Sequence, residues 1–249
     1  MRRLRAVVRL LRSVVHGLHG LGIVLVRFPR LSLVERQARI RWWSAGMLEA
    51  MGIALRVEGA PAPGPCLLVV NHISWLDIMV VHAVVPEARF VSKADVKSWP
   101  LIAQLVDAGG TLYLERERKR DALRVIHVMA AALRDGQKIA VFPEGTTSTG
   151  HGLLPFHANL LQAAISTGAP VQPLALRFSD VTDAVSEAVE FVGATTLAGS
   201  IWRSACGEGV VVSLTFLPPR ESSGFERRQL AARLRADIAA GLGVQLPEA

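Results

Sequence analysis

The chain has 249 residues, enough for one large domain with a substantial core, and its formal net charge is +7. Apolar residues make up 51% of it and its mean hydropathy is +0.34, values that are high for a soluble globular protein but too diffuse for several membrane spans. The two cysteines, Cys66 and Cys206, lie far apart without a Cys-x-x-Cys spacing, so the sequence indicates neither a zinc site nor a disulfide framework.

Positive charge is concentrated at the N-terminal end. The first 41 residues hold ten arginines and a single acid, Glu35. An arginine-rich segment suits either nucleic acid or anionic lipid, because both present dense phosphate. Valines and leucines at helical spacing, such as Val7, Leu11 and Val14, lie between these arginines, instead of the aromatic residues of a base-reading surface. We therefore predict a membrane-surface helix and no nucleic-acid partner; a basic surface helix of the folded core is the alternative.

The apolar part of this segment is short for a membrane span. Residues 13–26 supply about two-thirds of the ~20 apolar residues that a span needs, and they include His16 and His19. A monotopic or re-entrant anchor fits this pattern better than a span. The segment lacks a small-residue cleavage site, so we expect it to be retained.

A second helical stretch follows at residues 32–53 and brings Trp42 and Trp43 beside arginines. This combination is typical of lipid headgroup depth, although two core tryptophans on an ordinary helix would look the same. We assign residues 1–52 to basic amphipathic membrane-anchoring helices. The expected location is the cytoplasmic face of the inner membrane, where the protein would be peripheral or monotopic on an anionic surface.

From residue 53 onward, β-rich runs alternate with helical patterns. The alternation predicts an α/β fold with a single mixed β-sheet of about seven strands flanked by helices, in one domain over residues 53–249. The predicted strands are residues 53–59, 66–71, 88–93, 111–116, 138–145, 171–178 and 210–218, and the predicted helices between them are residues 76–85, 101–109, 120–136 and 159–168.

A last helix is predicted to cover the sheet near the C-terminus. Ser223 and Glu226 have the spacing of a capping box, and Leu234 and Ile238 share one helical face. Gly241 is expected to close this helix.

The stretch "NHISWLD", residues 71–77, directly follows a strand, at the kind of position where α/β sheets bind ligands. An aspartate that bonds to one ring nitrogen of a histidine fixes its tautomer and makes the other nitrogen more basic. A general base that acts on an alcohol requires this arrangement. His72 and Asp77 are therefore a candidate catalytic pair, with a helix-capping aspartate beside a surface histidine as the alternative.

Two further polar stretches follow strands. In "FPEGTTS", residues 142–148, backbone amides and hydroxyls could line an anion site. Arg116 follows another strand and can hold a phosphate by paired hydrogen bonds. Its basic neighbours at residues 118–120 are equally explained as a solvated charged loop.

Together these stretches resemble a known family. "NHISWLD" resembles the N-H-x-x-x-x-D signature of the glycerolipid acyltransferases of the lysophosphatidate acyltransferase (1-acyl-sn-glycerol-3-phosphate acyltransferase) type. "GTLYLER", "FPEGTTS" and "VQPLAL" resemble the three further blocks of that family, in the family order, over roughly half the chain. One block alone is weak evidence, whereas four in order are strong.

The resemblance implies an activity in phospholipid biosynthesis. A fatty acyl group would move from an acyl-CoA or acyl carrier protein thioester to the sn-2 hydroxyl of lysophosphatidate, giving phosphatidate. His72 would be the general base and Asp77 its orienting partner, with direct attack on the thioester and no acyl-enzyme. No cofactor or metal is expected, because a thioester is already activated.

The resemblance also implies which residues bind the acceptor. Asn71 would help to shape the site, and Arg116 would hold the acceptor phosphate. The remaining implied substrate-binding residues are Ser74, Glu144, Gly145, Thr146, Thr147 and Pro173.

The chain departs from the family pattern at three positions. Thr147 stands where the family often has arginine, and His157 and Asn159 replace the lysine and glycine of its P-F-K-x-G stretch. A lost arginine removes a strong bidentate phosphate ligand. Lyso-ornithine lipid, which has no phosphate, or another lysolipid is therefore the alternative acceptor.

Two remote alternatives belong to other functional classes. A serine hydrolase could use Ser74, but the chain has no G-x-S-x-G elbow and Ser74 is expected to cap the following helix. A non-catalytic lipid-binding protein would keep the basic N-terminus but would have no use for His72 with Asp77.

Overall fold

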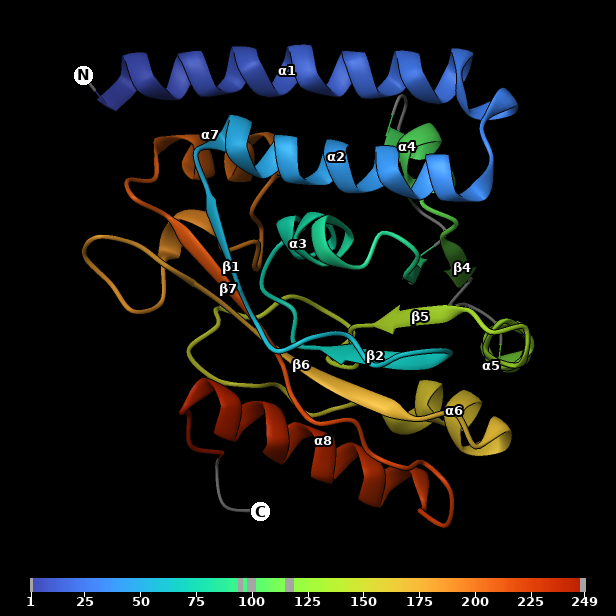
Figure 1. Ribbon diagram of the computed structural model, residues 1–249. Helices are drawn as coiled ribbons and strands as arrows, with labels where there is room; N and C mark the ends of the chain where they lie inside the picture. Colours follow the sequence, from blue (N-terminus) through green and yellow to red (C-terminus); the bar gives the residue numbers. More distant parts are fainter. Residues whose placement is uncertain (1, 94–95, 98–101, 115–118, 247–249) are drawn as a thin grey trace.

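A mixed seven-stranded sheet lies at the centre of the computed structural model, which describes residues 2–93, 96–97, 102–114 and 119–246 (Figure 1). The strand order is β1-β7-β6-β2-β5-β3-β4, with β6 and β7 antiparallel and all other neighbours parallel. The predicted fold is confirmed, and a strand is present at each of the seven predicted places. The strand predicted at residues 138–145 ends at Val141, and residues 115–116 of the strand predicted at 111–116 lie outside the described residues. The strands are β1 (Ala54–Glu58), β2 (Cys66–Val70), β3 (Arg89–Lys93), β4 (Leu112–Leu114), β5 (Lys138–Val141), β6 (Val171–Ser179) and β7 (Val211–Phe216).

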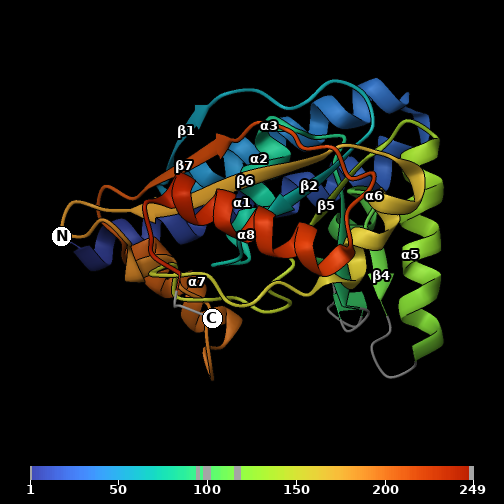
Figure 2. The ribbon, with the colours of Figure 1, turned by 90° about the horizontal axis from the view of Figure 1, so that it is seen from below.

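Helices cover both faces of this sheet (Figures 1 and 2). One face carries α2 (Leu33–Met51), α3 (Leu76–Val84) and α7 (Leu197–Cys206), and the other carries α5 (Lys119–Arg134), α6 (Gln162–Thr167) and α8 (Arg227–Leu242). The short α4 (Ile102–Ala108) lies near the β4 edge.

The central strand β2 is buried on both faces, which explains its continuous apolar run. Side chains alternate across a strand, so Leu68 and Val70 pack into the core cluster that includes residues of α2 and α3, whereas Leu67 and Val69 pack into the one that includes residues of α5 and α8. None of these four side chains has solvent exposure. The end of β2 is therefore a rigid support for the residues that follow it.

The N-terminal helix α1 (Arg2–Val26) lies antiparallel to α2 and is tied to the rest of the protein (Figure 1). His16 Nε2 and the Trp43 carbonyl lie 2.8 Å apart, and Trp43 Nε1 donates to the His16 carbonyl at 3.2 Å. Arg9 donates to the carbonyls of Ala205 and Gly207 at 3.0 and 2.5 Å. Trp43 thus joins the two helices, whereas Trp42 keeps 41% of its surface exposed.

The outer side of α1 presents a row of exposed apolar side chains. Among the described residues, one helix, Arg3–Val26, is long and apolar enough by length and composition to cross a membrane. Only 17% of its apolar 18-residue segment is buried within the protein. The exposed members of the row are Leu4, Val7, Val8, Leu11, Val14, Val15, Leu18, Leu25 and Val26.

Two details near the C-terminus differ from the sequence prediction. The predicted Ser223–Glu226 capping box is wrong: Gly224 turns the chain with φ +80°, and Glu226 is the N-cap of α8 without a side-chain cap bond. The helix continues through Gly241 and ends at Gly243, whose φ of +64° suits glycine. Helix α7 was not predicted from the sequence; Thr196 caps it by accepting a hydrogen bond from the Gly199 amide.

Candidate active site

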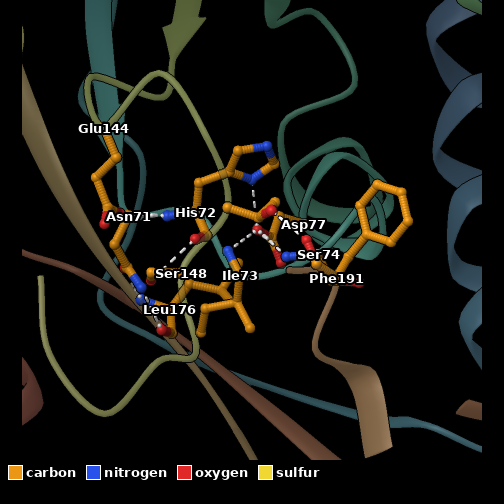
Figure 3. Close-up of polar contacts among 10 residues, drawn as sticks. Asn71, His72, Ile73, Ser74, Asp77, Glu144, Ser148, Leu176 and Phe191 are labelled. Atoms are coloured by element: carbon orange, nitrogen blue, oxygen red, sulfur yellow. Dashed lines mark hydrogen bonds and ion pairs between the residues drawn. The ribbon is translucent and has the colours of Figure 1, made fainter. Parts of the chain in front are cut away.

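His72 and Asp77 lie together where β2 ends and α3 begins (Figure 3). The His72 Nδ1 and Asp77 Oδ2 atoms are 2.8 Å apart. An ionised carboxylate can only accept, so Nδ1 carries the proton and Nε2 is left with a free lone pair. In Figure 3 the second ring nitrogen points away from Asp77. The pair thus has the geometry of a general base and its orienting acid.

Asp77 also organises the turn that carries His72. Its Oδ2 accepts the backbone amides of Ile73 at 2.7 Å and Ser74 at 2.9 Å, in addition to the His72 ring. The carboxyl group has no solvent exposure, and its Oδ1 has no hydrogen-bond partner among the described residues. The alternative of an aspartate that only caps a helix is therefore incomplete, because the same oxygen bonds both the helix start and the imidazole.

The ring of His72 is partly covered by Phe142, the first residue after β5. The two rings are nearly parallel, with centroids 3.9 Å apart and an interplanar angle of 12°. The His72 side chain keeps 18% of its surface exposed. One face of the imidazole is thus packed, while part of the ring remains accessible to a substrate. Phe142 belongs to the "FPEGTTS" motif, but no role was predicted for it from the motif.

Two other residues of the "FPEGTTS" block, Glu144 and Ser148, also contact His72. Glu144 Oε1 accepts the His72 amide at 2.7 Å, and Oε2 accepts the Leu154 amide at 2.9 Å. Ser148 donates to the His72 carbonyl from its amide at 2.8 Å and from its hydroxyl at 3.2 Å. Burial raises the pKa of Glu144. Gly145 supplies the turn between these contacts, with φ +71°.

Thr147 points to a different partner. Its hydroxyl donates to the carbonyl of Phe191, and the Phe191 amide donates to the carbonyl of Ile73 at 3.3 Å. The segment between β6 and α7 therefore packs beside the turn that carries His72, as Figure 3 shows for Phe191. The neighbouring Thr146 is exposed.

Asn71 and Pro173 are built into the sheet. The Asn71 side chain donates to the Leu176 carbonyl and accepts the Leu176 amide, both at 2.8 Å, and it is 1% exposed. Pro173 lies within β6, paired with Val69, and is buried. Both residues are buried, so neither presents its side chain at the surface.

Ser74 does not cap α3 as expected. The helix has Trp75 at its N-cap position without a side-chain cap bond. The Ser74 side chain is fully buried, and within the described ranges its hydroxyl has no hydrogen-bond partner. The Asp77 carboxylate instead accepts the backbone amides of the turn that precedes the helix.

The predicted phosphate ligand Arg116 lies outside the described residues, as does Arg118. Within the part of the chain that the structure describes, no group of three or more His, Cys, Asp or Glu side chains is placed to hold a metal ion.

Comparisons with known proteins show the family of the chain. The acyltransferase family model matches residues 54–177. A lyso-ornithine lipid O-acyltransferase of Pseudomonas aeruginosa is 34% identical over 96% of this chain and 93% of its own length. The chain belongs to the acyltransferase family. The predicted family and the prediction of an acyl-transferring enzyme are both confirmed.

Other relatives of this acyltransferase differ in their acceptors. A 1-acyl-sn-glycerol-3-phosphate acyltransferase of Neisseria meningitidis serogroup B is 36% identical over 74% of the chain and 72% of its own length. The solved structure of the 1-acyl-sn-glycerophosphate acyltransferase PlsC from Thermotoga maritima superposes with a TM-score of 0.75 at 21% identity, covering 98% of this chain and 97% of that one. This structural likeness supports the fold.

Proposed function

We propose that this acyltransferase moves a fatty acyl group from the thioester of acyl-CoA or acyl carrier protein to the free hydroxyl of a lysolipid. The observation that carries the proposal is the His72–Asp77 pair at the end of a buried central strand. A hydroxyl is a poor nucleophile until a base removes its proton, whereas a thioester needs no further activation.

The pair accounts for each step of the transfer. His72 Nε2 takes the proton of the acceptor hydroxyl as the oxygen attacks the thioester carbonyl carbon. The buried Asp77 carboxylate stabilises the imidazolium that forms. When the carbon–sulfur bond breaks, the imidazolium returns the proton to the leaving thiolate, which yields the ester and a free thiol. A buried hydroxyl such as that of Ser74 does not suit a hydrolase nucleophile.

For the acceptor we infer lyso-ornithine lipid, which reverses the order of preference in the sequence analysis. Thr147 stands at the family's arginine position, and its hydroxyl is already bonded to the Phe191 carbonyl. It therefore offers a phosphate neither a charge nor a free donor. The Pseudomonas relative named for lyso-ornithine lipid also aligns over nearly its full length.

Lysophosphatidate is the second candidate, supported by the Neisseria relative and by Arg116 in the sequence. Parallel transfer assays with both lysolipids, with products identified by mass spectrometry, decide between them. Thr147→Arg should raise the kcat/KM ratio of lysophosphatidate over lyso-ornithine lipid about tenfold, because a charged hydrogen bond to phosphate is gained. Thr149→Arg adds the same charge two residues away, on an exposed side chain, as a control. A wild type that prefers lysophosphatidate would contradict the inferred acceptor.

We place the enzyme on the cytoplasmic face of the inner membrane as a peripheral or monotopic protein. The exposed apolar row of α1 and the surrounding arginines support contact with an anionic bilayer. The cytoplasmic face is inferred from the donors, because acyl-CoA and acyl carrier protein are cytoplasmic thioesters.

A further inference from the structure

The segment Phe142–Ser148 reaches His72 from a neighbouring strand. Strands β2 and β5 are parallel, and Val69 pairs with Val141. Three residues further along each chain, His72 and Glu144 therefore emerge side by side. The segment then contacts the amide, the carbonyl and the ring of His72 through Glu144, Ser148 and Phe142.

The contacts of Glu144 suit a structural role better than acceptor binding. Each carboxylate oxygen already accepts a backbone amide, and the residue is only 3% exposed. A carboxylate that bound an acceptor headgroup would need an oxygen open to solvent. Burial also disfavours the charged form of Glu144, as its raised pKa shows. The chain thus keeps a costly buried carboxylate at the backbone of its catalytic base.

The contact of Phe142 is continued into the core by further rings. Phe90 lies behind Phe142, with centroids 5.4 Å apart, and His82 packs edge-on against Phe90 at 5.0 Å. Phe90 is 2% exposed and His82 7% exposed. The face of the imidazole of His72 is therefore backed by packed side chains rather than by solvent.

We propose that Glu144 and Phe142 are positioning residues that act on the reaction through His72. Glu144 fixes the backbone of His72, and Phe142 fixes the plane of its imidazole. The proposal rests on the proposed function, and it assigns Glu144 a role different from the acceptor binding that the family resemblance implies.

Glu144→Gln separates the two roles. A glutamine has one acceptor oxygen, so it can serve only one of the His72 and Leu154 amides. We expect kcat to fall about 10- to 100-fold, as for a misplaced catalytic group, while the KM for the acceptor stays within about twofold. Glu221→Gln makes the same chemical change on an exposed side chain and serves as the control. A tenfold rise in KM with unchanged kcat would show acceptor binding and overturn the proposal.

Hydrogen exchange of the His72 amide tests the geometry without relying on turnover. In protein labelled with ¹⁵N-histidine, this amide should exchange at least about tenfold faster in Glu144→Ala, which removes both acceptor oxygens, than in wild type or the exposed control Glu221→Ala. Equal exchange rates overturn the proposal, whichever acceptor the enzyme uses. A wild type that is inactive on every lysolipid, with the exchange difference present, would instead refute the proposed function.

A second variant keeps the proposal testable if Glu144→Gln does not fold. Phe142 is half-buried, and Phe142→Leu retains apolar volume while removing the flat ring. We expect its kcat to fall about tenfold with acceptor KM unchanged, and Phe142→Tyr, which keeps the ring, to recover most of the loss. A Phe142→Leu enzyme with wild-type kcat overturns the assignment of Phe142.

Discussion

Asp77 offers the most informative pair of substitutions, because one oxygen of its carboxylate serves both the imidazole and the backbone. In Asp77→Asn the amide oxygen can occupy the Oδ2 position and still accept from His72, Ile73 and Ser74. The amide nitrogen then takes the place of Oδ1, which has no partner among the described residues. The acceptor contacts are kept and the charge is lost, while the buried NH2 group adds two donors at the Oδ1 position.

The expected cost can be worked out from these contacts. A hydrogen bond to a charged group contributes about 1.5–3 kcal/mol and a neutral one about 0.5–1.5 kcal/mol. The lost charge should therefore raise the barrier by about 1–2 kcal/mol, which lowers kcat about 5- to 30-fold. In Asp77→Ala the buried amides of Ile73 and Ser74 also lose their acceptor. Each such loss costs about 1–3 kcal/mol, so the free energy of unfolding should fall by about 2–6 kcal/mol.

The assay has two parts. Initial rates of acyl transfer by detergent-purified enzyme give kcat for wild type and Asp77→Asn, and denaturant unfolding compares the stability of all three proteins. An Asp77→Asn enzyme with wild-type kcat would refute the role of the carboxylate charge. An Asp77→Ala protein as stable as wild type would refute its role in holding the turn.

Three further predictions concern other parts of the molecule. Burial raises the pKa of Cys66 to about 11. A thiol reagent at pH 8 should therefore modify the partly exposed Cys206 and leave Cys66 unmodified until the protein is denatured. Fast modification of Cys66 in the folded protein would contradict its burial. Leu11→Asp on α1 should reduce the fraction of protein that floats with anionic vesicles, whereas Leu123→Asp on α5 should not. The two side chains are similarly exposed, Leu11 at 62% and Leu123 at 59%. Equal flotation of the two variants would refute α1 as the contact surface. The raised pKa of Glu144 means that the folded protein holds a proton that the unfolded chain releases above its ordinary pKa of 4.5. The difference in free energy of unfolding between wild type and Glu144→Gln should thus favour wild type most below pH 4.5 and decline as the pH rises through the raised pKa. Denaturant titrations at several pH values measure this difference. A difference that does not change with pH would contradict the burial effect.

The sheet could be predicted from the sequence because its strands are short apolar runs bounded by turn residues. Strand β2 shows this most clearly, since burial on both faces requires a continuous apolar sequence. Helix α7 was missed because its sequence mixes glycine and serines with apolar residues, and its burial depends on tertiary packing. The Ser223–Glu226 box failed because Gly224 turns the chain before the helix begins.

The contact between His72 and Asp77 could be predicted because the two residues are close in sequence and meet across one turn. The contacts of Glu144 and Phe142 with His72 could not be predicted, because they depend on the parallel register of β2 with β5. The pairing of Asn71 with the backbone of Leu176 likewise depends on the position of β6 beside β2. Local spacing predicts contacts within a turn, whereas contacts between strands require the sheet order.

The most direct test of the account measures acyl transfer with and without the proposed base. Purified wild type and His72→Ala are each given a labelled acyl thioester and lyso-ornithine lipid in detergent, and the acylated product is quantified by mass spectrometry. The account predicts a product from wild type, and at least about a hundredfold lower rate from a folded His72→Ala protein, in line with the usual contribution of a general base. Equal rates in the two proteins would contradict the assignment of His72 as the base.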